Sequence, residues 1–205
     1  GNKVYQNTVL GAEPQDFNYN GDETTLVIGD ENIFRENVVI NRATFKDGET
    51  RIGNRNFFME GVHISHDTKV DDYCTFGYGT KIAGDCEVHS AVIFSSGVIV
   101  NANVRIGGAS MVTGGVRISK DVPPFIVATD NPVRYAGVNE TLLQNSGTEH
   151  KVIGHIANAY RLVFHGQTSV FDAINQIKEQ VPAGKEIDSI ISFLESTKIG
   201  IISKI

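Results

Sequence analysis

The segment VHISHD, residues 62–67, carries the side chains of this chain that are best suited to proton transfer. His63 and His66 lie three residues apart, and Asp67 follows His66 directly. A carboxylate beside an imidazole fixes the tautomer of the ring and stabilises the imidazolium, which is the usual arrangement of a general base. The segment is therefore a candidate general-base site.

The other reactive side chains give weaker signals. Three histidines fall in the C-terminal part of the chain, where surface positions are expected, and His89 is given no role. The serines lack the GxSxG motif of a nucleophile elbow, and the chain has neither a phosphate-binding loop nor a dinucleotide fingerprint. Nucleophilic serine chemistry and nucleotide-cofactor chemistry are therefore not predicted.

A six-residue period runs through the middle of the chain. From Ile52 to Ile118, every sixth residue is aliphatic or phenylalanine, without a slip in register. An α-helix needs apolar spacings of three and four, and an ordinary amphipathic strand alternates with a period of two. A strict six-residue period instead predicts a short strand and a corner, repeated, with one large side chain pointing inward on each side. Three sides close a triangular prism, so about eighteen residues form each coil of a parallel β-helix.

A second restricted position lies four residues after each of these apolar residues. It holds small or β-branched side chains, with one asparagine, and both cysteines, Cys74 and Cys86, fall on it. We therefore expect both thiols to be buried rather than catalytic or metal-binding. The period extends upstream to Val4. Residues 12–25 and 45–51 keep the count but are polar, so we expect two surface loops that help to shape a site.

Stacking of the coils argues against a catalytic zinc ion at the histidine pair. Such an ion needs three protein ligands. The residues eighteen positions after His63 and His66 are Lys81 and Gly84, and a lysine beside the pair would repel a cation. We expect no metal. The same spacing places Gly84 beside His66.

The pattern changes after Val122. Two prolines follow, and proline cannot donate to a β-ladder. From Glu149 onward, apolar residues recur at spacings of three and four in three stretches, which predicts helices. The expected organisation is a parallel β-helix over residues 1–122, a connecting segment over 123–148 and a helical region over 149–205.

The composition of the chain argues against several classes of function. The chain has 205 residues and a formal net charge of −6, which argues against a nucleic-acid-binding protein. Its apolar runs are too short to span a bilayer. Two cysteines cannot form a disulfide framework and suggest a reducing compartment. We expect a cytoplasmic protein without an integral membrane segment.

Four stretches resemble the UDP-N-acetylglucosamine O-acyltransferases that begin lipid A synthesis. They are GAEPQDFNYNGD, IGDENIFRENVVINRAT, MEGVHISHD and KDVPPFIVATDNP, the last followed by GVN. The resemblance covers essentially the whole chain, including the helical tail with AYRLVF. It implies a left-handed parallel β-helix with a C-terminal helical appendage. It also implies that the family fold begins about three coils before Gly1.

The resemblance implies roles for particular residues. His66 would remove the proton from the 3-hydroxyl of the sugar, Asp67 would orient His66, and the N–H of Gly84 would stabilise the oxyanion. The donor would be a (3-hydroxy)acyl thioester on acyl carrier protein, with no further cofactor, and the protein would be a homotrimer. The residues implied in substrate binding are His63, Asp16, Gln15, Asn139 and Gly114, the last at the end of the acyl pocket.

The chain departs from the family at several polar positions. Asp85 replaces a histidine, Asn18 replaces a lysine, Asn101-Ala102 replaces a His-Gln pair, and residues 144–146 replace a basic run. Two alternatives therefore stay open. One is a paralogue that acylates a different nucleotide sugar, for example at an amine, and the other is a β-helical binding protein without catalysis. A monomer is the alternative to the trimer.

Overall fold

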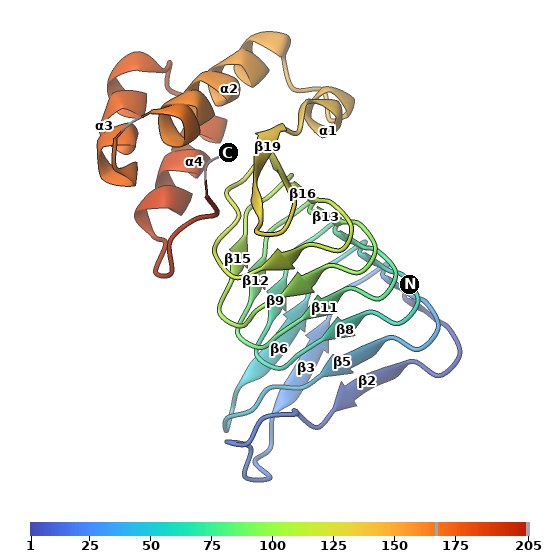
Figure 1. Cartoon of the computed structure of the whole chain (residues 1–205). Coiled ribbons are helices and arrows are strands. Elements are labelled where there is room, and N and C mark those ends of the chain that lie inside the picture. The colour runs from blue at the N-terminus through green and yellow to red at the C-terminus, as the bar shows by residue number, and fades with distance from the viewer. Residues whose placement is uncertain (167, 204–205) are drawn as a thin grey trace.

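A left-handed parallel β-helix carries a small helical region on its C-terminal end (Figure 1). The computed structural model describes residues 1–166 and 168–203. The predicted helical region over 149–205 therefore includes residues 167, 204 and 205, which lie outside the described residues. We call the coils nearer the C-terminus the upper coils, so a residue lies above its counterpart in the preceding coil. The predicted fold class is confirmed.

Each coil contributes one short strand to each of three sheets, and the strands within a sheet pair in parallel register. Within the described residues, the first sheet has eight strands, of which the last is antiparallel. Its strands are β1 (Lys3–Val4), β4 (Ile33–Phe34), β7 (Phe57–Phe58), β10 (Thr75–Phe76), β13 (Ile93–Phe94), β16 (Met111–Val112), β18 (Ile126–Thr129) and β19 (Arg134–Val138).

The other two sheets complete the prism. The second sheet holds β2 (Val9–Ala12), β5 (Val39–Asn41), β8 (His63–Ile64), β11 (Lys81–Ile82), β14 (Ile99–Val100) and β17 (Arg117–Ile118). The third sheet holds β3 (Thr25–Ile28), β6 (Glu49–Ile52), β9 (Lys69–Val70), β12 (Glu87–Val88) and β15 (Arg105–Ile106). The chain visits the first, second and third sheets in turn, so residues eighteen apart stack on one another.

Aromatic rings fill the prism beneath the first sheet. Phe34, Phe58, Phe76 and Phe94 stack in a column, with ring centroids 5.0, 4.7 and 5.1 Å apart. Each of the four is at most 1% exposed. Burial of large apolar side chains provides the main stabilisation of such a core. The small position of each hexad is buried as well, and burial raises the pKa of the thiols of Cys74 and Cys86 to about 12. The cysteines are therefore packing residues, as predicted.

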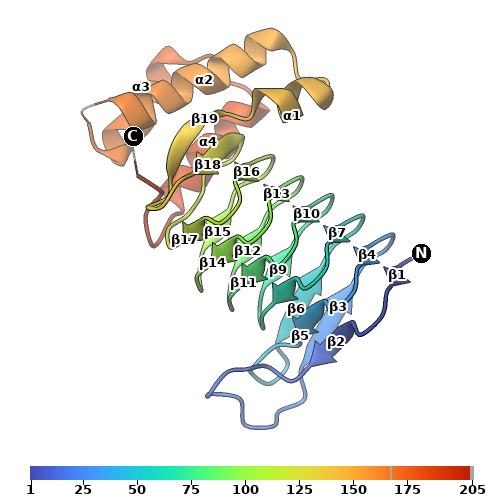
Figure 2. The ribbon, with the colours of Figure 1, turned by 45° about the vertical axis from the view of Figure 1, so that its right-hand side comes forward.

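Both polar stretches form loops at the same edge of the prism, between the second and third sheets. We call this the loop edge. The first loop, residues 13–24, joins β2 to β3 and projects from the stack (Figure 2). The second loop, residues 42–48, joins β5 to β6. Leu10 pairs with Ile40 and Ile40 with Ile64, so these loops lengthen two coils to 30 and 24 residues without changing the six-residue phase.

The helical region lies on the upper end of the stack (Figure 2). Its helices are α1 (Glu140–Asn145), α2 (His150–His165), α3 (Val170–Gln180) and α4 (Lys185–Glu195). The three-and-four spacing predicted α2, α3 and α4, whereas α1 was not predicted. The segment from 123 to 148 is not a simple connection, because β18 continues the first sheet and forms an antiparallel hairpin with β19.

Arg105 joins the helical region to the prism. Its guanidinium donates to Asp121 Oδ2 at 3.1 Å, to Ser196 Oγ at 3.0 Å and to the Phe193 carbonyl at 2.9 Å. It also lies 4.3 Å from the centre of the Phe193 ring. Asp121 is only 1% exposed, and a buried carboxylate needs such a partner. Thr197 donates to the same oxygen at 2.7 Å. The end of α4 is thereby fixed against the loop edge.

We expect Phe76→Ala to lower the free energy of unfolding by about 3–5 kcal/mol, because it leaves a cavity in the centre of the ring column. Phe171→Ala is the matched control, since Phe171 is 71% exposed on α3, and we expect a change within about 0.5 kcal/mol. Denaturant unfolding followed by circular dichroism measures both. Equal losses for the two variants would contradict the assigned role of the column.

Candidate active site

His66 and Asp67 form a hydrogen-bonded pair at the loop edge, between β8 and β9. The Nδ1 atom of His66 lies 2.8 Å from Asp67 Oδ2, and the two side chains are 13% and 18% exposed. An ionised carboxylate only accepts hydrogen bonds, so the neutral ring carries its proton on Nδ1. The lone pair of the neutral ring is then on Nε2. The pair thus has the geometry of a general base with its orienting acid.

Asp16 approaches the same ring from the first loop. Its Oδ2 atom lies 3.7 Å from His66 Nε2. The backbone N–H of Asn18 donates to Asp16 Oδ1 at 2.9 Å, and this bond is the main cause that lowers the pKa of the Asp16 carboxyl below its usual value. Asp16 is therefore ionised at neutral pH and accepts hydrogen bonds next to Nε2. Gln15 precedes it and is exposed.

Two residues at the end of β5 hold the first loop in place. The guanidinium of Arg42 donates to Tyr19 Oη at 2.7 Å and to the carbonyl of Gly11 at 3.2 Å. The side-chain amide of Asn41 donates to the carbonyl of Glu13 at 2.6 Å. The sequence alone does not reveal these contacts, because the loop folds back across a coil.

His63 is neutral and faces Asn41. Its Nε2 lies 2.7 Å from Asn41 Oδ1. Because the Asn41 amide nitrogen already donates to the first loop, the Asn41 oxygen must accept, so His63 Nε2 carries the proton. Burial, with smaller contributions from Lys81 and His66, lowers the pKa of His63. His63 therefore supports the first loop through Asn41 and is not the better placed base.

Gly84 lies directly above His66, as the eighteen-residue spacing predicted. A Cβ atom at Gly84 would collide with Cε1 of His66 and lie 2.6 Å from its Nε2. The corresponding corner position one coil higher is Ala102, so the fold itself does not require glycine there. Glycine is needed because the imidazole packs against it. Within the described residues, no protein acceptor receives the Gly84 N–H, which leaves this donor available beside Nε2.

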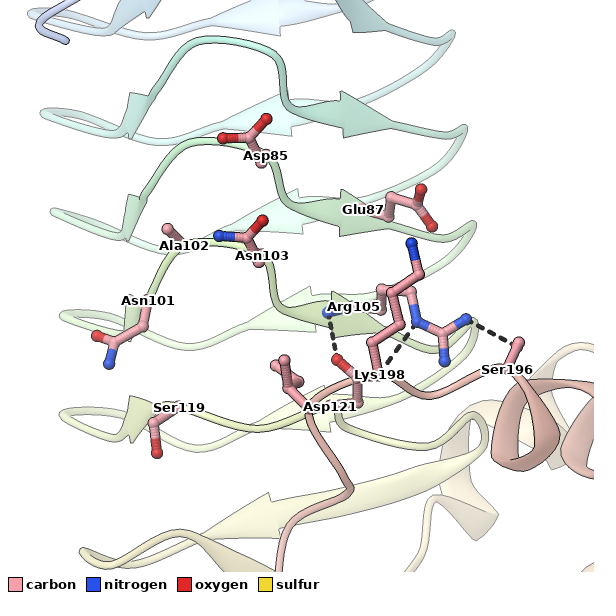
Figure 3. A pocket seen from close by; sticks show the side chains of 11 residues that line it. Asp85, Glu87, Asn101, Ala102, Asn103, Arg105, Ser119, Asp121, Ser196 and Lys198 are labelled. Carbon is pink, nitrogen blue, oxygen red and sulfur yellow. Dashed lines mark hydrogen bonds and ion pairs between the residues drawn. The ribbon is translucent and has the colours of Figure 1, made fainter. Parts of the chain in front are cut away.

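Asp85 follows Gly84 and leads into the pocket of Figure 3. Burial, followed by the nearby charge of Asp67, raises the pKa of the Asp85 carboxyl. The pocket has a volume of about 600 Å³ and extends along the loop edge to the segment after α4. Asn103 lies on the next coil, while Arg105 and Lys198 provide two cations (Figure 3). The pocket therefore begins at Asp85, the residue after Gly84, and ends at the helical region.

Two predicted site residues lie at other edges of the prism. Gly114 follows β16, at the edge between the first and second sheets. Asn139 precedes α1, is 5% exposed and donates to the carbonyl of Ala109, at the edge between the third and first sheets. The chain therefore brings His66, Asp67, Gly84, Asp16 and His63 together, but it does not bring Gly114 or Asn139 to them.

Residues 1–166 and 168–203 contain no group of three or more histidine, cysteine, aspartate and glutamate side chains that could hold a metal ion. No helix in the described part of the chain is long and apolar enough to cross a membrane.

Several known proteins have a similar fold and a similar sequence. A family model described as UDP-N-acetylglucosamine O-acyltransferase, domain 2, matches residues 121–202. An acyl-(acyl-carrier-protein)–UDP-N-acetylglucosamine O-acyltransferase of Syntrophobacter fumaroxidans is 35% identical over 98% of this chain and 79% of its own length. The corresponding protein of an Anaeromyxobacter species is 33% identical over the same shares. A solved UDP-N-acetylglucosamine acyltransferase from Bacteroides fragilis has a TM-score of 0.96 and 40% identity, over 98% of this chain and 79% of that chain.

The fold is thus that of the left-handed β-helix acyltransferases. The chain belongs to the UDP-N-acetylglucosamine O-acyltransferase family, as its similarity to these relatives over 98% of this chain shows.

We expect Gly84→Ala to displace the imidazole of His66, because the new methyl group would occupy the space of the ring. A crystal structure of the variant measures the displacement. Gly108→Ala is the matched control, since Gly108 has the same place in its hexad at another edge and a Cβ there would come no closer than 3.1 Å to Ser90 O. An unmoved His66 ring in Gly84→Ala would show that the contact does not determine the choice of glycine.

Proposed function

We propose that this chain transfers a (3-hydroxy)acyl group from acyl carrier protein to the 3-hydroxyl of UDP-N-acetylglucosamine, the reaction that begins lipid A synthesis. The observation that carries this proposal is the His66–Asp67 pair beneath the free N–H of Gly84. Family membership supports the reaction class, and the named relatives supply the donor and acceptor classes.

In the proposed reaction, Nε2 of His66 takes the proton of the sugar hydroxyl while the oxygen of that hydroxyl attacks the thioester carbonyl carbon. The carbonyl oxygen becomes an oxyanion that accepts a hydrogen bond from the N–H of Gly84. The carbon–sulfur bond then breaks, and the thiolate of the carrier takes the proton from Nε2. The products are a sugar ester and a free thiol. Asp67 stabilises the imidazolium between the two proton transfers.

The acceptor would bind below His66, against the first loop. Asp16 is ionised and accepts hydrogen bonds, so it can orient sugar hydroxyls next to Nε2. The exposed Gln15 offers a further polar contact, and His63 supports this wall through Asn41. The donor would approach from above, through the pocket that begins at Asp85. This arrangement brings the two substrates to opposite sides of the imidazole.

We further propose that the chain acts as a homotrimer. Gly114 and Asn139 lie at different edges from His66, so one chain cannot bring all the proposed substrate contacts together. A neighbouring copy packed against the loop edge can supply the residues of its other edges. Clefts between packed subunits are common ligand sites. The acyl chain would then lie between two copies and end near Gly114 of the neighbour.

We expect His66→Ala to lower kcat at least about a hundredfold, because it removes the general base. The assay follows acyl transfer from acyl carrier protein to UDP-N-acetylglucosamine and, in parallel, to a UDP-sugar with an amine at the acceptor position. His89→Ala is the matched control, since His89 forms a comparable pair with Asp71, at 3.2 Å, on another edge. Full activity of His66→Ala would refute the assigned base. Preference for the amine would favour a different sugar, and binding without transfer of any acyl group would favour a non-catalytic protein.

Sedimentation equilibrium tests the trimer, with an expected mass of about three times the 22.3 kDa of one chain. Mixing the His66→Ala and Asn139→Ala chains should restore part of the activity that each variant lacks alone, because some mixed trimers contain an intact shared site. A mass near 22.3 kDa would contradict the trimer.

A further inference from the structure

The corners of the prism are held by one repeated backbone hydrogen bond. From residue 55 to residue 115, a stretch described without a gap, every sixth residue has a positive φ and lies at a corner. Except at Asp67, the N–H of each of these residues donates to a carbonyl in the coil below. Asp85 donates to the carbonyl of His66 at 3.1 Å, and Asn103 donates to that of Gly84 at 3.1 Å. The bonds therefore connect each corner to the one beneath it.

Asp67 is the exception within this stretch. It has a φ of 58° like its counterparts, but its N–H donates to the side-chain Oγ1 of Thr50 at 2.8 Å. If Asp67 followed the pattern of the other corners, the coil register would place the carbonyl of Arg42 beneath its N–H. At Arg42, however, the chain leaves the coil and enters the second loop. The loop thus removes the ordinary backbone acceptor, and a hydroxyl takes its place.

The same loop also holds the Asp67 carboxylate. The backbone N–H of Thr44 donates to Asp67 Oδ2 at 3.1 Å, and this oxygen also faces Nδ1 of His66. Thr44 and Thr50 are both 0% exposed, so water does not substitute for either contact. Asp67 is therefore fixed at its amide and at its carboxylate by residues of the second loop and of the strand that follows it.

We propose that Thr50 is a positioning residue for the reaction, acting through Asp67 on the tautomer and orientation of His66, with the second loop as its support. This inference rests on the proposed function for its effect on catalysis. Residues that orient a catalytic side chain act through geometry, so their loss lowers the rate more than it weakens substrate binding.

The fold provides well-matched variants for the test. Thr50 has the small position of its hexad, and valine is fully buried at the equivalent positions 62, 92, 98 and 104. Thr50→Val therefore fits the prism and removes only the hydroxyl. Thr80 is the matched control, because it is equally buried at the same hexad position, at the edge between the first and second sheets, and donates to the carbonyl of Ser95 at 3.3 Å.

We expect Thr50→Val to lower kcat about tenfold, the effect of one lost hydrogen bond, while KM for the nucleotide sugar changes less than about twofold. Thr50→Ser should restore kcat to within about threefold of the wild type, because it returns the acceptor oxygen. Thr80→Val should keep the kcat of the wild type. A folded Thr50→Val protein with unchanged kcat, or a loss that serine does not rescue, would overturn the proposal.

A double-mutant cycle separates positioning from a general structural role. If Thr50 acts through Asp67, Thr50→Val should add little to the loss caused by Asp67→Asn, whereas an independent structural defect would lower the rate equally in both backgrounds. Equal losses would therefore contradict the proposal.

Nitrogen-15 NMR of labelled histidine gives a readout that does not need turnover. The wild type should show His66 protonated on Nδ1 in its neutral form, and Thr50→Val should show a mixture of tautomers. If the wild type transfers no acyl group, the proposed function fails, and the tautomer of His66 still decides the role of Thr50. An unchanged tautomer in Thr50→Val would reject that role.

Discussion

Parallel stacking of the coils in fixed register is the constraint on which the site depends. Each strand is only a few residues long, and its backbone forms hydrogen bonds with the strands of the coils above and below. A slip of one strand by one residue would therefore turn its inward apolar side chain outward. This register places Gly84 against the ring of His66 and puts a polar pocket on the next coils. Residues that are eighteen positions apart in the sequence become neighbours in space because they share the same position in the repeat.

The polar groups around His66 differ in what they can do because their surroundings differ. Asp67 accepts from the ring, Asp16 is kept ionised by the Asn18 amide, and burial raises the pKa of Asp85. The pKa values of Asp16 and Asp85 are therefore moved in opposite directions. Under the proposed function, an ionised Asp16 can accept hydrogen bonds from sugar hydroxyls while Asp67 orients His66.

The sequence predicted the parts of the fold and site that follow from periodicity. The six-residue period predicted the prism, the buried cysteines and the contact between His66 and Gly84. The six-residue period could not predict the contacts of Asp16, Thr44 and Thr50 with His66 and Asp67. Two loops interrupt the repeat there, and residue spacing does not reveal the contacts that these segments make at the site. Helix α1 was too short to give a clear apolar period, and the bonds of Arg105 to α4 join segments far apart in the chain.

The lengths of the two loops have a consequence for how this molecule can change. Each lengthens its coil by a whole number of hexads, so the coils that follow keep their orientation. Whole-hexad insertions or deletions at the loop edge can therefore alter the wall beside His66 without changing the phase of the core residues. The strands after each loop pair in parallel register with those of the neighbouring coils. The two loops thus supply Asp16 and Thr44 to the surroundings of His66 and Asp67 while the stacked core stays in phase.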